Sequence, residues 1–186
     1  MALTETRPDT TEPAAAVESE PVARTQPTAV EKVLGTGDHK SIGRIFIGAS
    51  LLFLVTDLVL TALVNFHIAD GGDLIEATFA NRLWLNHPIA LMLCGVLPLL
   101  LGLAIYVVPL QVGAPTIAFP RAAAMSLWGW LGATVLFTVA LIAKGSYGGS
   151  SEKLSRLGHV SFGLLMVSLL VGAVCVMATV ISLRPA

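Results

Sequence analysis

The sequence predicts an all-α integral membrane protein with four transmembrane helices, and three observations lead to this fold class. First, 55% of the 186 residues are hydrophobic and only 12% are charged, about half the charged share of roughly 25% in soluble domains. Second, the apolar residues form long blocks instead of alternating at helical or strand spacing. Third, each block has the roughly 20 residues that a helix needs to cross the hydrocarbon core. Because lipid offers no hydrogen bonds to the backbone, such blocks are helical.

The four predicted spans cover residues 45–64, 88–110, 122–143 and 160–183. The last three contain no charged residue, and the first contains only Asp57. A charged residue in the middle of a span is unfavourable in lipid, so it is a functional candidate by default. The alternative for Asp57 is a hydrogen-bonded carboxyl group that holds helices together or pairs with a partner chain.

Small residues at helical spacing predict the faces on which these helices pack. The candidate pairs are Gly95 with Gly102 in the second span, Gly129 with Gly132 in the third, and Ser168 with Gly172 in the fourth. In addition, Pro98 predicts a kink in the second span, because proline has no N–H to donate within a helix.

The chain divides into a polar N-terminal tail, residues 1–36, and a membrane domain, residues 37–186. The tail is rich in Pro, Thr, Ala and Glu and has too few apolar residues to bury a core, so we expect it to be disordered. It contains no apolar stretch typical of a cleaved signal peptide, and the first span is expected to direct insertion itself. The formal net charge of −1 excludes a basic surface for nucleic acid.

Four spans place both termini on the same side of the membrane. If that side is the cytoplasm, five Lys or Arg residues lie near span ends on the inside and four on the outside, a weak preference by the positive-inside rule. The polar tail favours the same orientation, because it then needs no translocation. We therefore expect a cytoplasmic N-terminus and a cytoplasmic C-terminus.

Several short motifs occur at the ends of these spans. Asp38, His39 and Lys40 open the segment 38–43 before the first span, with Asp38 as the predicted N-cap, and His87 ends the segment 81–87 before the second. The turn 106–121 joins the second and third spans and contains the residues Gly113, Pro115, Pro120 and Arg121. Two further short motifs lie at residues 124–128, in the third span, and 178–186, at the end of the fourth span.

Taken in order, these motifs resemble the first four of the twelve helices of subunit I of haem-copper terminal oxidases, the cytochrome c oxidase family. The resemblance covers roughly residues 37–186. It implies that His87 occupies the position of a low-spin haem ligand, although Pro88 replaces the glycine of that family. The copper ligands, the high-spin haem ligand and the second low-spin haem ligand belong to later helices of that family, so we expect no enzyme activity from this stretch by itself.

The proton pathway of the family is also altered. The resemblance implies an aspartate at the mouth of a proton channel where this chain has Thr116, and asparagines where it has Ala122, Ala123 and Ala124. Neither threonine nor alanine ionises near neutral pH. The turn therefore keeps the glycine and prolines that shape it and loses its proton-transferring groups.

Three histidines, His67, His87 and His159, are expected near one side of the membrane. Three imidazoles at one level can bind zinc or copper, and two can bind a haem, so these residues are candidate metal ligands. The simpler interpretation is separate interfacial histidines that bond to water, lipid headgroups or a partner subunit.

We therefore predict a truncated, subunit-I-like accessory subunit of a bacterial oxidase or its supercomplex, in the plasma membrane, beside the catalytic subunits. No cofactor is firmly predicted, and a haem in this chain alone is the less favoured expectation. Two alternatives stay open: a small haem-binding electron carrier that uses His87, and the N-terminal half of a split oxidase subunit I.

Overall fold

The computed structural model describes residues 37–71 and 75–183. The predicted tail, residues 1–36, lies outside the described residues, as does the end of the motif 178–186. The described part is helical throughout, and four of its helices are long and apolar enough to cross a membrane, as predicted. Its elements are α2 (His39–Ala69), α3 (Ala77–Ile89), η1 (Ala90–Val96), α4 (Leu97–Val112), α5 (Pro120–Ile142) and α6 (Glu152–Ser182).

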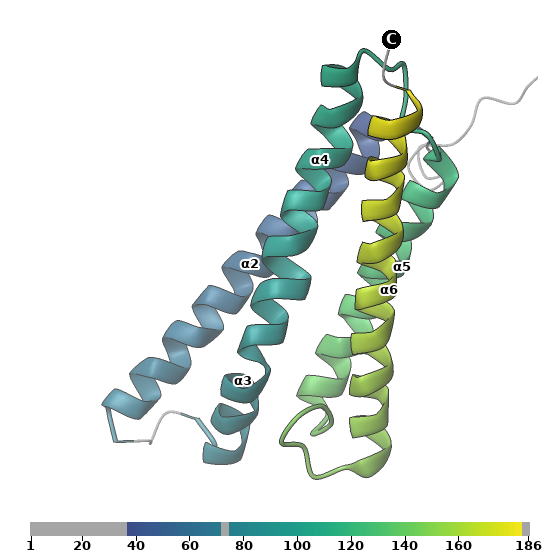
Figure 1. The fold of residues 1–186 in the computed structure, drawn as a ribbon. Coiled ribbons are helices and arrows are strands. Elements are labelled where there is room, and N and C mark those ends of the chain that lie inside the picture. Colours follow the sequence, from purple (N-terminus) through teal and green to yellow (C-terminus); the bar gives the residue numbers. More distant parts are fainter. Residues whose placement is uncertain (1–36, 72–74, 184–186) are drawn as a thin grey trace, which may run out of the picture.

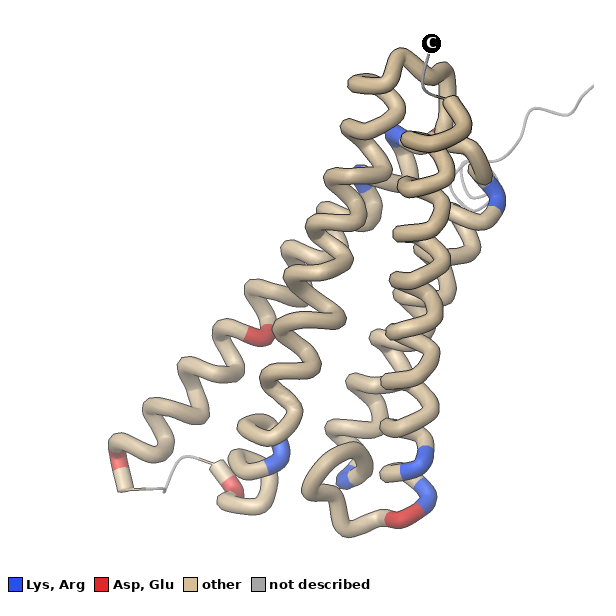
Figure 2. The backbone as a smooth tube through the Cα atoms, in the orientation of Figure 1, with Lys and Arg blue, Asp and Glu red and all other residues tan. Residues whose placement is uncertain are grey.

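The helices form two pairs. The elements α3, η1 and α4 are one continuous helix of 36 residues, Ala77–Val112, which packs along α2, while α5 packs along α6. The two pairs are close together where α2 begins and α6 ends, and they lean apart towards the opposite end (Figure 1). Apart from one acidic position midway along α2, charged residues gather at the two ends of the bundle (Figure 2), which leaves a largely apolar middle layer suited to lipid.

The helices extend further than the predicted spans. The second helix begins at Ala77, ahead of the predicted span 88–110, so Pro88 lies inside the helix. The prediction used the run without charged residues as its boundary. A helix can continue past that boundary when its polar side chains find hydrogen-bond partners. Arg82, in the part of the helix before residue 88, is an example: it is 4% exposed and donates to the backbone carbonyl of Leu141.

The continuous second helix changes its hydrogen-bond register before Pro98. Residues Ala90–Val96 form a π-helix, in which Leu97 N donates to Met92 O. Neither register gives the carbonyl of Leu93 a backbone donor, because Leu97 is engaged elsewhere and Pro98 has no N–H. The indole Nε1 of Trp130 donates to Leu93 O at 2.9 Å instead. The core tryptophan, which is 0% exposed, thus compensates for the irregular backbone.

Close helix contacts occur at most of the predicted small residues. A Cβ atom on Gly102 would lie 2.6 Å from Phe46 Cβ, so Gly102 allows α4 to approach α2 closely. Between α5 and α6, Ser126 Oγ donates to Ser168 O at 2.7 Å, and Gly172 faces Ser126. Gly132 is the exception: it faces open space, so the predicted Gly129–Gly132 face is only half correct.

Asp38 is the N-cap of α2, as predicted. Its carboxylate accepts hydrogen bonds from Lys40 N at 3.2 Å, Ser41 N at 3.1 Å and Ser41 Oγ at 2.8 Å. The two backbone donors, Lys40 N and Ser41 N, are among the N–H groups that a helix start leaves without an intrahelical partner. The DHK segment thus begins the bundle by ordinary capping chemistry.

The stability that Asp38 contributes is expected to depend on pH. Partial burial raises the pKa of Asp38, but the hydrogen bonds from Ser41 and Lys40 outweigh it and lower the pKa overall. A lowered folded-state pKa contributes stability above the unfolded-state value of about 3.9, and this contribution is lost as the pH falls through the folded value. Asp38→Ala is expected to cost about 1 kcal/mol near pH 7 and progressively less below pH ~4. Thermal unfolding in detergent across this range measures it.

Asp38→Asn is the matched control, because an amide oxygen also caps a helix but carries no charge. Its stability should lack the acid-dependent component. A deficit of Asp38→Ala that stays constant well below the unfolded pKa would contradict the assignment of the cap to the carboxylate.

Candidate functional site

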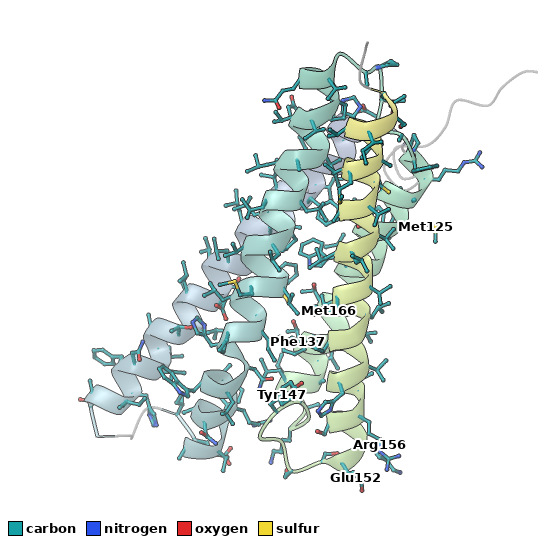
Figure 3. All side chains as sticks on the ribbon, in the orientation of Figure 1. Met125, Phe137, Tyr147, Glu152, Arg156 and Met166 are labelled. Atoms are coloured by element: carbon teal, nitrogen blue, oxygen red, sulfur yellow. The ribbon has the colours of Figure 1, made fainter. Side chains whose placement is uncertain are left out.

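A cavity of about 230 Å³ lies between α2, the α3–η1 helix and α5. Most of its wall is apolar, with Leu60 from α2, Leu83 from α3 and Phe137 from α5. Phe137 is labelled in Figure 3, on the half of the molecule where the helix pairs lean apart. Several polar side chains also line it, and among them Asp57 and His87 are the ionisable pair, with Thr61 beside them.

Asp57 and His87 form a pair that connects α2 with α3. Asp57 Oδ2 lies 2.9 Å from His87 Nδ1, and the side chains are 13% and 24% exposed. Thr61, one helical turn after Asp57, places its Oγ1 2.8 Å from the same ring nitrogen. The packing role expected for Asp57 and the ligand position expected for His87 therefore meet in a single site.

Asn86, next to His87 in α3, connects this helix to the α5–α6 connection. It is 1% exposed, and its Nδ2 donates to Arg82 O at 2.8 Å and to Tyr147 O at 2.9 Å. Its Oδ1 accepts from Ser146 Oγ at 2.5 Å. Asn86 is a functional position that the sequence did not single out, although a polar residue next to a histidine at the edge of a span is a signal for an interhelical contact.

Arg82 supports the same end of the bundle. Its Nη1 donates to Leu141 O at 3.0 Å, and its guanidinium lies 5.4 Å from the centroid of the Phe79 ring. Leu141 is in the last turn of α5, where carbonyls lack intrahelical donors and the helix dipole favours a cation. Arg82 thereby connects the C-terminal end of α5 to α3.

The structure does not bring the three predicted histidines together. His67 Nδ1 accepts from Ile75 N at 3.2 Å, while His159 is exposed, lies 2.7 Å from Ser155 O and packs its ring against Tyr147. Within residues 37–71 and 75–183, no group of three or more His, Cys, Asp or Glu side chains is placed to hold a metal ion. Among the described residues the three histidines therefore form no metal cluster, and each ring contacts its own neighbours.

The turn between α4 and α5 is held by packing. Gly113 ends α4 with φ 74°, a left-handed conformation that favours glycine. Ile117 is 0% exposed, and Ala118 N donates to Thr179 Oγ1 of α6 at 3.0 Å. Pro120 then opens α5 at its first turn, where a missing N–H costs nothing.

The remaining motif residues lie around this end of the bundle. Pro115 and Arg121 are exposed, Thr116 is half-buried and Lys40 is exposed. His39 is 4% exposed at the first residue of α2. Thr116 thus stands in a packed turn in which residues 113–120 have no ionisable side chain.

The residues of the cavity fit one axial position of a haem. Nδ1 of His87 is hydrogen-bonded to Thr61 and lies at ion-pair distance from Asp57, so Nε2 is the ring nitrogen that has no protein contact of this kind. A carboxylate beside a ligating imidazole is common in metal sites. Neither His67 nor His159 lines the cavity, so these residues do not supply a second axial nitrogen. An electron carrier that pairs His87 with either of them does not fit this arrangement.

Comparison with known proteins agrees with the resemblance noted in the sequence. Residues 41–186 match the family model described as Cytochrome C and Quinol oxidase polypeptide I. A probable cytochrome c oxidase subunit 1-alpha of Streptomyces avermitilis is 34% identical over 113 residues, which are 60% of this chain and 20% of that protein. A putative cytochrome c oxidase subunit 1-beta of Streptomyces coelicolor is 36% identical over 109 residues, 58% of this chain and 19% of that protein.

A quinol oxidase subunit 1 of Bacillus subtilis is 28% identical over 112 residues, 60% of this chain and 17% of that protein. The chain thus spans about a fifth of the length of the curated relatives it matches. With four helices that fit a membrane and a family match over residues 41–186, it is a multi-pass membrane protein that belongs to the cytochrome c and quinol oxidase polypeptide I family.

Proposed function

We propose that the chain is a non-catalytic, structural subunit of an aerobic terminal oxidase in the bacterial plasma membrane, with both termini in the cytoplasm. The observation that carries this proposal is the turn between α4 and α5. It keeps the left-handed Gly113, the buried Ile117 and the contact to α6, yet Thr116 stands where the family resemblance implies a proton-accepting aspartate. The turn therefore keeps the residues that pack it, while the ionisable aspartate that the family resemblance implies is replaced by Thr116.

The outer surface of the bundle supports a role in assembly. The helix α2 is the least covered of the four, with 17% of its most apolar stretch buried by the rest of the chain, compared with 33–39% for the others. Large apolar side chains such as Leu52, Val59 and Phe66 are exposed along it. A surface of this kind suits lipid and the helices of catalytic oxidase subunits.

Co-purification tests this function. The tagged full chain, solubilised in mild detergent from cells that express it naturally, is expected to bring oxidase subunits and oxygen consumption with it. The chain produced alone is expected to consume no oxygen. Thr116→Val in the complex should leave oxygen consumption unchanged, since the turn then transfers no proton. Recovery of the chain without any oxidase subunit would contradict the proposal.

A second candidate function is the N-terminal part of a split oxidase subunit I, in which His87 holds a haem. The Asp57–His87 pair in an apolar cavity favours it, because this is the arrangement of a ligating histidine. A bound haem would supply one-electron transfer, and His87 in its apolar surroundings would hold it. Loss of a low-spin haem signal from the visible spectrum of the complex in His87→Ala would establish this candidate over the first.

A further inference from the structure

We infer that the chain binds one phospholipid with an ethanolamine headgroup between α2 and the α3–η1 helix, with an acyl chain of this lipid in the cavity beside Phe137. The inference does not depend on either candidate function. It concerns a single lipid molecule held at a defined place, in addition to the lipid that surrounds any membrane helix.

The cavity adjoins a second hollow at one end of the bundle. This edge hollow, of about 290 Å³, lies between the end of α2 and the start of α3, and Val64 and Trp84 line both spaces. It is also lined by Ile68, near the end of α2, and by Ala77, the first residue of α3. The cavity itself reaches Asp57, midway along α2, whereas charged residues gather at the end where the edge hollow lies (Figure 2). The two spaces together run from the membrane edge towards its middle, which is the direction of an acyl chain.

The cavity suits a hydrocarbon chain and is reached from the lipid. Its wall includes Leu60, Phe137 and Leu141, and two of its lining residues are exposed at the surface of the bundle, Leu52 by 66% and Trp84 by 52%. A space of this size left unfilled would deprive the wall of van der Waals partners, so a filling group is favoured. The surrounding membrane supplies acyl chains at this depth.

The edge hollow offers a hydrogen-bond donor to the glycerol and phosphate region of the lipid. His67 lines it, and Nδ1 of His67 accepts from Ile75 N, so the hydrogen of the neutral ring is on Nε2. Among the described residues Nε2 has no hydrogen-bond partner, yet it is not a fully buried atom. An ester or phosphate oxygen is an acceptor for it. Trp84 beside it is a ring of the kind found at membrane interfaces.

The charges around the edge hollow select the headgroup. Asp70, the C-cap of α2, and Glu76, the N-cap of α3, are both exposed and flank the residues that line it. Among the described residues no Lys or Arg lines either space, and the nearby Arg82 is 4% exposed and bonded to Leu141 O. Anionic lipids are bound through Lys and Arg, so this acidic edge favours a headgroup with an ammonium group. Ethanolamine carries one and can donate charge-assisted hydrogen bonds to the carboxylates.

Native mass spectrometry of the purified full chain tests the inference. The chain is placed in mild detergent with equal amounts of phosphatidylethanolamine and phosphatidylglycerol that have the same acyl chains. The wild type is expected to retain one phospholipid, with phosphatidylethanolamine preferred. Ala90→Leu puts a larger side chain into the cavity and is expected to lose the retained lipid. Thr138→Leu is expected to do the same from an exposed position of α5, where the fold tolerates the change.

Ala62→Leu is the matched control, because Ala62 is exposed on α2 and lines neither space, so this variant should retain the lipid as the wild type does. Asp70→Asn combined with Glu76→Gln should lower the preference for phosphatidylethanolamine about two- to fivefold, the usual effect of exposed charge pairs.

Two results would overturn the binding place: no lipid retained by the wild type, or the same retention in the wild type, Ala90→Leu and Thr138→Leu. Equal retention of the two lipids by the wild type would overturn the choice of an ethanolamine headgroup. None of these measurements uses oxygen consumption or a haem spectrum, so failure of this inference is distinct from failure of either candidate function.

Discussion

Replacing Gly102 with alanine is expected to destabilise the bundle by about 1–3 kcal/mol or more, the cost of forcing an extra methyl group into a packed contact. The added Cβ would lie 2.6 Å from Phe46 Cβ, 3.0 Å from Ile47 N and 3.1 Å from Gly43 O. Two of these atoms belong to the backbone of α2, so no side-chain rotation relieves the contact and the two helices must separate. Unfolding in a mixed-detergent series measures the loss.

Gly132→Ala is the control for this prediction. Gly132 is also a glycine inside a membrane helix, but a Cβ there would meet nothing within 4 Å. Alanine is the better helix former by roughly 1 kcal/mol, so the control is expected to be neutral or slightly stabilising. Equal stability of the two variants would show that α2 and α4 do not cross at Gly102.

Asn86→Leu is expected to detach the α5–α6 connection from α3. The substitution removes the donor to Tyr147 O and the acceptor for Ser146 Oγ, and Ser146 is 2% exposed. Each buried polar group left without a partner costs about 1–3 kcal/mol. The connection between Ile142 and Glu152 should therefore loosen, which limited trypsin digestion after Lys144 detects as faster cleavage.

Asn81→Leu is the matched control for Asn86→Leu, because it makes the same substitution at an exposed position of the same helix. Its cleavage rate should equal that of the wild type. If both variants are cleaved equally fast, the amide of Asn86 does not hold the connection.

The helix count was predictable because lipid imposes it. Blocks of apolar residues with no charge can satisfy their backbone only as helices, whatever their neighbours are. The ends of the helices were less predictable. Whether α3 continues from Ala77 through Pro88 depends on partners for Arg82 and Asn86, and these partners belong to α5 and the α5–α6 connection.

The site shows the same division. Asp57 and His87 each stood out in the sequence, one as a charge within a span and the other by its place in a motif. The contact between them could not be predicted, because they lie on two different helices and no sequence pattern links the two positions. The three histidines do not meet among the described residues, because a similar predicted depth in the membrane does not bring side chains to one point.

The sequence by itself determined the membrane class, the four helices, the Asp38 cap and the family to which residues 41–186 belong. These features follow from lipid solvation and from local hydrogen bonding, which depend on neighbours along the chain. Only the tertiary structure decided that Trp130 donates to the π-helix, that Asn86 is bonded to the α5–α6 connection and that Asp57 lies beside His87. Each of these contacts joins residues brought together by helix packing, where direction and distance are set by the whole bundle.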